Sequence, residues 1–91
     1  MLKQKNCQHL ENLEVNFQKG TQCDECVKTG DRWVHLRTCQ TCGTTLCCDS
    51  SINKHASKHA RSHKHPVVIS AEAGEKWAYC YIDEQIKMNA L

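Results

Sequence analysis

The sequence predicts a small α+β domain with a twisted antiparallel sheet and one main helix. Residues 33–37, 44–47 and 67–69 are short alternating or uniformly apolar stretches of the kind found in strands. Residues 52–61 follow Asp-Ser-Ser at 49–51, a cluster of helix-capping residues. Eight cysteines and a single phenylalanine among 91 residues indicate a thin apolar core, which cross-links or bound metal must support.

The first half of the chain is expected to hold two strands around a cysteine pair. Residues 1–6 are expected to be a flexible tail. A Cys-Gln-His stretch follows at 7–9, whose cysteine and histidine lie on the same side if the backbone is extended. Residues 13–17 alternate apolar and polar side chains, which favours a strand. The first CxxC pair follows at 23–26, and the alternating stretch at 33–37 then predicts the second strand.

The second half is expected to hold the main helix and the remaining strands. A second CxxC pair at 39–42 precedes the helix predicted at about 52–61. Pro-Val-Val-Ile at 66–69 ends the helix and begins a buried strand. The aromatic stretch at 77–82 predicts a last strand, after which Asp83 could cap a short helix over 84–89.

The spacing of cysteines and histidines indicates zinc. A CxxC pair can close on one metal ion, and His55 and His59 lie one helical turn apart on one face. A framework of disulfides is the alternative for an even number of cysteines. The histidines beside the cysteines argue against it, as does an N-terminus without an apolar signal stretch, so we expect a reduced, cytoplasmic protein.

The number of zinc ions stays open between two and three. Eight ligands would fill two tetrahedral sites: Cys23, Cys26, Cys39, Cys42, Cys47, His55, His59 and His65. Four further residues would complete a third: Cys7, His9, Cys48 and Cys80. His63 competes with His65 for the second site, and the adjacent Pro66 favours His65 because it rigidifies that position.

Several classes of function are disfavoured. The formal net charge of +2 is too small to indicate a nucleic-acid or membrane partner, and no run of 18 apolar residues occurs. Sites closed by four protein ligands leave no position for an activated water, and no nucleophile stands apart from the ligands. We therefore expect a monomeric binding module rather than an enzyme.

The order of these motifs resembles a known family. Cys-x-His, CxxC, Trp-Val-x-Leu, CxxC-Gly, His-Ala-x-x-His and His-Pro follow one another as in the ubiquitin-protease-type (UBP-type) zinc finger. This is the ubiquitin-binding module of many deubiquitinases and of one class of histone deacetylase. The resemblance covers residues 7–83, looks most like short stand-alone bacterial members, and leaves 84–91 as a C-terminal helix or tail.

The resemblance implies how the ligands divide. One zinc would bind Cys23, Cys26, Cys47 and His55. The other would bind Cys39, Cys42, His59 and His65. In three-zinc members the Cys-x-His pair joins two late cysteines, but here Ala78 and Tyr81 occupy the places expected for cysteines beside Cys80. A third site would then take Cys48 as its fourth ligand; otherwise Cys48 and Cys80 are free thiols.

The resemblance also implies a pocket for the Gly-Gly carboxylate of ubiquitin. The family grips that carboxylate with an arginine in a Cys-Gly-Arg step, whereas this chain has Cys-Cys-Asp at 47–49. Trp77 and Tyr79 match the late aromatic wall and Trp33 the early tryptophan, while Arg37 (or Arg32) could supply a replacement cation. We expect these residues to bind a protein or peptide tail of unknown identity. Trp33 and Trp77 could instead only fill the core, which is the interpretation we favour for Trp33, while Trp77 stays open between the two.

Two alternatives remain. The basic residues of the predicted helix and its continuation could contact nucleic acid, although the low net charge makes that partner unlikely: Lys54, Lys58, Arg61 and Lys64. If Cys48 and Cys80 are spare thiols beside the zinc ions, they could instead act as a redox sensor.

Overall fold

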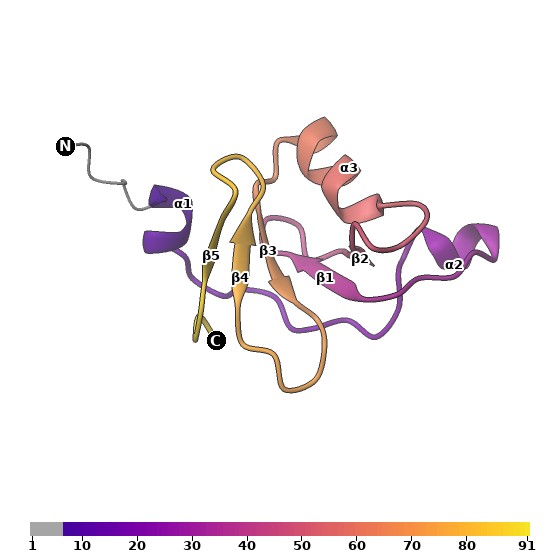
Figure 1. The fold of residues 1–91 in the computed structure, drawn as a ribbon, viewed down its shortest axis with the longest axis horizontal. Helices are drawn as coiled ribbons and strands as arrows, with labels where there is room; N and C mark the ends of the chain where they lie inside the picture. The colour runs from indigo at the N-terminus through magenta and orange to yellow at the C-terminus, as the bar shows by residue number, and fades with distance from the viewer. Residues whose placement is uncertain (1–6) are drawn as a thin grey trace.

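The computed structural model describes residues 7–91, so the tail predicted at 1–6 lies outside the described residues. The described residues form three helices: α1 (Gln8–Glu11), α2 (Cys26–Thr29) and α3 (His55–His63). Five strands accompany them: β1 (Leu36–Cys39), β2 (Thr45–Cys47), β3 (Val67–Ser70), β4 (Ala78–Cys80) and β5 (Gln85–Lys87). The predicted α+β class is confirmed (Figure 1).

The strands form one antiparallel sheet in the order β2-β1-β3-β4-β5. All four residues of the central strand β3 are buried, which accounts for its run of three apolar residues, Val67 to Ile69. Arg37 of β1 lies opposite Ser70 of β3. Tyr79 of β4 lies opposite Val68 on one side and Ile86 on the other. Because paired residues share a face and side chains alternate along a strand, Arg37 and Tyr79 project from the same face of the sheet.

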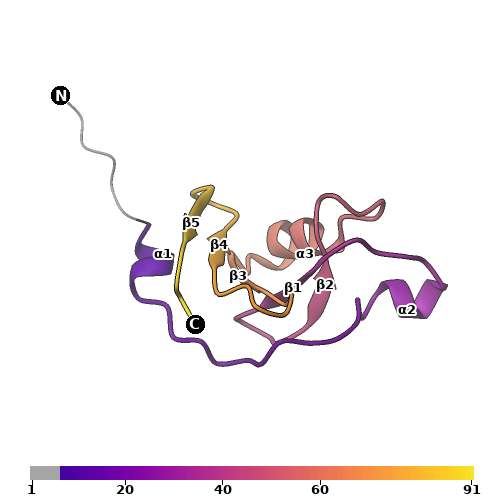
Figure 2. The same cartoon turned by 60° about the horizontal axis from the view of Figure 1, so that its bottom comes forward.

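The sheet is covered differently on its two faces. Helix α3 packs against β1 and β2, with Ala56 in one apolar cluster with Leu46. On the other face, Leu10 and Leu13 of the N-terminal segment pack against a second cluster that contains Ile69. Figure 2 shows α3 and the N-terminal segment on opposite sides of the sheet. Helix α3 covers the β1–β2 end of its face of the sheet. The end of that face near β4 and β5 is left uncovered by the helix.

The strand predicted at 13–17 is absent, and that prediction was wrong. The backbone N–H groups of Asn16 and Phe17 donate to the side-chain oxygen of Gln40, at 2.9 and 3.2 Å. The Gln40 amide in turn donates to the Phe17 carbonyl at 3.2 Å. A side chain therefore satisfies backbone groups that a neighbouring strand would otherwise have to satisfy.

The main helix begins at His55, three residues later than predicted. Lys54 has a left-handed backbone (φ 51°), and the first helical N–H, that of His55, donates to Cys47 Sγ at 3.3 Å. Ser51 does not cap the helix, because its hydroxyl accepts from the Val34 N–H at 2.8 Å. A thiol has replaced the oxygen cap that the sequence suggested.

The C-terminal part of the chain also differs from prediction. The predicted helix at 84–89 is replaced by strand β5, while the Cys-Gln-His stretch at 7–9 leads into α1 rather than being extended. Glu84 has a left-handed backbone (φ 52°), which ends the turn after β4 and lets residues 85–87 pair with β4. Pairing with an open sheet edge thus overrides local helix propensity. No helix within residues 7–91 combines the length and apolar character needed to cross a membrane.

Candidate metal centres and an aromatic pocket

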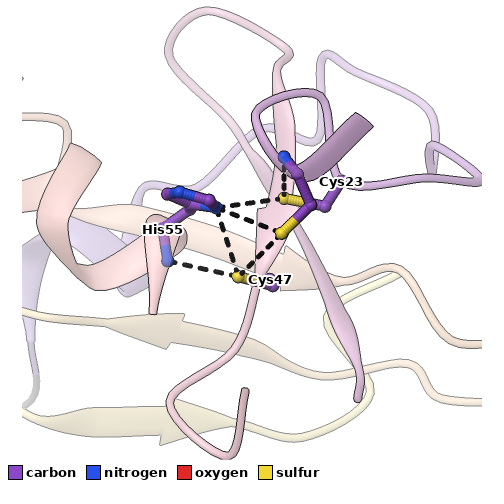
Figure 3. A group of neighbouring side chains, drawn as sticks. Cys23, Cys47 and His55 are labelled. Atoms are coloured by element: carbon purple, nitrogen blue, oxygen red, sulfur yellow. Dashed lines mark hydrogen bonds between the residues drawn. The ribbon is translucent and has the colours of Figure 1, made fainter. Parts of the chain in front are cut away.

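The first metal group consists of Cys23, Cys26, Cys47 and His55. Cys23 precedes α2, Cys26 begins it, Cys47 ends β2 and His55 begins α3. Figure 3 shows the sulfur atoms of Cys23 and Cys47 turned toward the His55 ring. The three cysteines are fully buried. Residues from four parts of the chain therefore converge at one point, as the resemblance implied.

The spacing of this group fits a tetrahedral zinc ion. With zinc–ligand bonds of about 2.3 Å to sulfur and 2.0–2.1 Å to nitrogen, ligand atoms should lie about 3.6 Å (S to N) and 3.8 Å (S to S) apart. His55 Nδ1 lies 3.4, 3.4 and 3.5 Å from the Cys23, Cys26 and Cys47 sulfurs. The Cys26 and Cys47 sulfurs are 3.9 Å apart. All four separations match one central ion.

The groups around the first metal group stabilise cysteine thiolates once a cation is bound. Burial raises the pKa of the Cys26 thiol to about 12, so a bare site would hold its proton at neutral pH and zinc would displace it. The Cys26 N–H donates to Cys23 Sγ at 3.4 Å and the Asn53 amide to Cys26 Sγ at 3.6 Å. These donors offset negative charge on the sulfurs.

The second metal group consists of Cys39, Cys42, His59 and His65. His59 Nε2 lies 3.4 Å from Cys42 Sγ and 3.1 Å from His65 Nδ1, which is itself 3.6 Å from Cys39 Sγ. These values also suit a tetrahedral ion. Cys42 is exposed, so this group is more open to solvent than the first. Because His55 and His59 serve different groups, α3 is anchored at both of its turns.

His63 stands beside the second group without joining it. Its ring stacks on His59 with centroids 4.5 Å apart and remains exposed. The group that the structure brings together contains His65, as predicted, rather than His63.

The third metal group corrects a sequence prediction: its fourth member is Asp83, not Cys48. The sulfurs of Cys7 and Cys80 each lie 3.6 Å from His9 Nδ1, a spacing that fits zinc. Asp83 Oδ2 lies 3.1 Å from His9 Nδ1 but 2.8 Å from Cys7 Sγ. The last contact is the hydrogen bond of a thiol donating to a carboxylate, shorter than the roughly 3.6 Å between two ligands of one zinc. This group is therefore the least regular of the three.

Cys48 instead lies buried beside a different site. Burial acts to raise the pKa of its thiol, but hydrogen bonds from the Ser50 backbone and the Ser51 hydroxyl outweigh it and lower the pKa to about 7. The positive charge of Arg37 acts in the same direction. The side chain is held by the turn that precedes α3, away from Cys7 and Cys80.

That different site is the aromatic pocket, a cavity of about 210 Å³ on the part of the sheet face that α3 leaves uncovered. Its lining consists of an arginine, three aromatic rings, an aspartate, a cysteine and an isoleucine: Arg37, Trp77, Tyr79, Tyr81, Asp49, Cys48 and Ile86. The Arg37 guanidinium lies over the Trp77 ring, 4.5 Å from its centroid. Tyr79 and Tyr81 meet edge to face at 5.0 Å. A cation and flat apolar walls thus face one small cavity.

The structure divides the predicted peptide-binding residues. Arg37, Trp77 and Tyr79 meet in the aromatic pocket. Trp33 does not line it; it packs against the apolar cluster around the first metal group, in line with the core interpretation favoured for that residue. The prediction missed Tyr81 and Ile86. Tyr81 could have been found, because it continues the every-second-residue pattern of Trp77 and Tyr79.

A short sheet and a helix anchored by cysteine and histidine groups define this chain as a zinc finger, with zinc as its cofactor. Residues 23–89 match the family described as "Zn-finger in ubiquitin-hydrolases and other protein". The match spans most of the chain, and the protein belongs to this family. The resemblance seen in the sequence is confirmed.

The chain is similar to two further proteins, one by sequence and one by structure. It is 33% identical over 61 residues to the NAD-dependent deacetylase sir2A of Dictyostelium discoideum, a match covering 67% of this chain but 11% of the deacetylase. The chain therefore spans about a tenth of that relative's length. The solution NMR structure of protein RPA1320 from Rhodopseudomonas palustris superposes with a TM-score of 0.80 at 36% identity, covering 97% of this chain and 86% of that one.

Proposed function

We propose that this chain is a non-enzymatic module that binds the carboxylate end of an extended protein or peptide tail in the aromatic pocket. The observation that carries the proposal is Arg37, a half-buried guanidinium that lines the cavity and forms no ion pair, although its charge is felt by Glu75. Among residues 7–91 the ion pairs join His9 to Asp83 and Lys28 to Glu25, and neither involves Arg37.

Arg37 is positioned in advance for an anion. Its Nη1 donates to the Leu36 carbonyl at 2.9 Å, and the Trp77 ring lies under the guanidinium. Fixing the side chain in this way reduces the entropy lost when a ligand binds. The remaining donors of the planar guanidinium suit the two oxygens of a carboxylate.

The other walls suit a slender peptide backbone. Tyr79, Tyr81 and Ile86 provide flat or apolar surfaces around the cation. A cavity of about 210 Å³ is smaller than the roughly 300–1,000 Å³ typical of small-molecule sites, so it fits one or two residues of a tail. A Gly-Gly tail, which the family resemblance implies, is the first ligand to test.

The zinc groups support a binding role rather than catalysis. The first and second groups each bring four protein ligand atoms together, which fills a tetrahedral zinc and leaves no position for an activated water. Zinc here holds β1, β2 and α3 in place, and these elements carry Arg37 and the turn containing Asp49. The metal therefore shapes the pocket without acting on the ligand.

The proposal is tested by NMR titration of the zinc-loaded, ¹⁵N-labelled chain with a peptide ending in Gly-Gly. We expect the free acid to shift the resonances of Trp77, Tyr79 and the Arg37 side chain, and the C-terminal amide to leave them unchanged. Arg37→Gln should weaken binding at least tenfold, since a hydrogen-bonded charge pair contributes about 1.5–3 kcal/mol.

Arg61→Gln is the matched control, because Arg61 is an exposed arginine on α3 outside the pocket. It should bind like the unaltered chain. Equal binding of acid and amide, or no binding of either at millimolar peptide, would show that this pocket does not read a carboxylate.

A further inference from the structure

We infer that Asp49 makes the aromatic pocket prefer tails in which a lysine or arginine precedes the C-terminal residue. This inference rests on the function proposed above and adds a ligand preference to it. Two opposite charges face the same small cavity: the Arg37 guanidinium and the exposed Asp49 carboxylate.

The two charges are not paired with each other. In the part of the chain that the structure describes, neither Arg37 nor Asp49 takes part in an ion pair, and each therefore remains open to a ligand. A cavity that keeps a cation and an anion apart is complementary to a molecule carrying both signs close together. A lone carboxylate would satisfy Arg37 and be repelled by Asp49.

Asp49 is held close to the rings of the pocket. Its side chain lines the same cavity as Tyr79 and Tyr81. The Cys48 N–H donates to the His35 carbonyl at 3.0 Å and the Ser51 N–H to the Cys48 carbonyl at 3.0 Å, which fixes the turn on either side of Asp49. The backbone that carries Asp49 is therefore fixed at the rim of the pocket.

The lining of the cavity holds one group of each charge. Among the residues that line it, Arg37 is the one cation and Asp49 the one carboxylate. Once a ligand carboxylate neutralises Arg37, the negative charge of Asp49 is left without a counterpart in the lining.

These charges specify the occupant. The tail's carboxylate pairs with Arg37, and a basic side chain on the preceding residue answers Asp49 at the rim. Lysine and arginine can do this because their long flexible stems carry the charge several ångströms from the backbone. An acidic residue at that position would face Asp49 and be disfavoured.

The test uses the zinc-loaded chain and three N-acetylated pentapeptides that end in glycine with a free carboxylate. The peptides differ in the preceding residue, which is lysine, serine or glutamate. We expect the lysine peptide to bind about fivefold more tightly than the serine peptide, the upper range for a solvent-exposed charge pair, and the glutamate peptide to bind most weakly. At 0.5 M salt these differences should shrink, because exposed charges are screened.

Asp49→Asn should bring the lysine and serine peptides close to equal affinity while retaining binding of both. Glu14→Gln is the charge-matched control, since Glu14 is exposed on the N-terminal segment and does not line the pocket. It should keep the full preference. Unchanged amide spectra outside the turn would establish that both variants fold.

The outcomes separate the two proposals. If all three free-acid peptides bind equally, or if Asp49→Asn keeps the preference, the role of Asp49 is wrong while the carboxylate pocket stands. If none of the free acids binds, the proposed function fails and this inference fails with it.

Discussion

At the scale of single residues, Asp83 completes the third metal group although the pattern of cysteines and histidines did not indicate it. It lies three positions after Cys80, the spacing of a CxxC pair, and its N–H donates to Cys80 Sγ at 3.5 Å. A carboxylate oxygen is an accepted zinc ligand, so the spacing alone could have indicated it. Searching only for cysteines led instead to Cys48.

Replacing Asp83 tests its part in the third metal group. We expect native mass spectrometry to count three zinc ions on the unaltered chain and two on Asp83→Ala, because three remaining ligands hold the ion less tightly. Glu84→Ala, an exposed acid next in sequence, should keep three. Two ions on the unaltered chain would mean that Asp83 forms only hydrogen bonds.

At the scale of elements, Gln40 fastens the N-terminal segment to the sheet. It is a buried residue of the turn that connects β1 and β2, and its side chain bonds Asn16 and Phe17. The Gly20 N–H in addition donates to the Thr38 hydroxyl at 3.2 Å. These contacts place the segment across the face opposite α3 (Figure 2). The segment is thereby held without strand pairing.

Gln40→Ala should therefore destabilise the domain. Leaving partly buried N–H groups without an acceptor costs about 1 kcal/mol or more, which corresponds to a melting temperature lower by roughly 5 °C or more in a domain of this size. Gln18→Ala removes an exposed glutamine from the same segment and should lower it by less than about 3 °C. Both melts need the same free zinc concentration, since a bound metal raises apparent stability. Equal melting temperatures would contradict the role given to Gln40.

At the scale of the whole molecule, metal groups substitute for a large core. The two apolar clusters are small and contain cysteines of the first and third metal groups, so the core and the metal sites overlap. Helix α3 spans nine residues, too short to be stable alone in water. The fold therefore depends on zinc binding energy, about 10–16 kcal/mol for a structural zinc.

Removing the metal should unfold the chain. We expect a chelator to abolish the helical circular-dichroism signal and the dispersion of amide resonances, and added zinc to restore both. Magnesium should not restore them, because it prefers oxygen ligands in octahedral geometry. Persistence of native amide dispersion after complete zinc removal would show that the apolar clusters suffice.

The amino-acid sequence alone was enough to predict the chemistry of the metal groups and the two strands β2 and β3. Thiolate and imidazole side chains favour zinc wherever they are brought together, and β2 and β3 follow the predicted stretches closely because their residues favour strands on their own. The family resemblance supplied the division of ligands between the first two groups, and the structure brings those same residues together.

Strand formation and side-chain positions that depend on residues distant in sequence followed from the tertiary fold. Residues 85–87 form a strand because they can pair with the open edge of β4. Residues 13–17 do not form one, since the Gln40 side chain accepts the hydrogen bonds of the Asn16 and Phe17 N–H groups. Arg37 reached the aromatic pocket because strand pairing set it on the same face as Tyr79. Local sequence fixes propensity and side-chain chemistry, whereas the sheet register fixes which side chains meet, and that register follows from contacts between residues far apart in the chain.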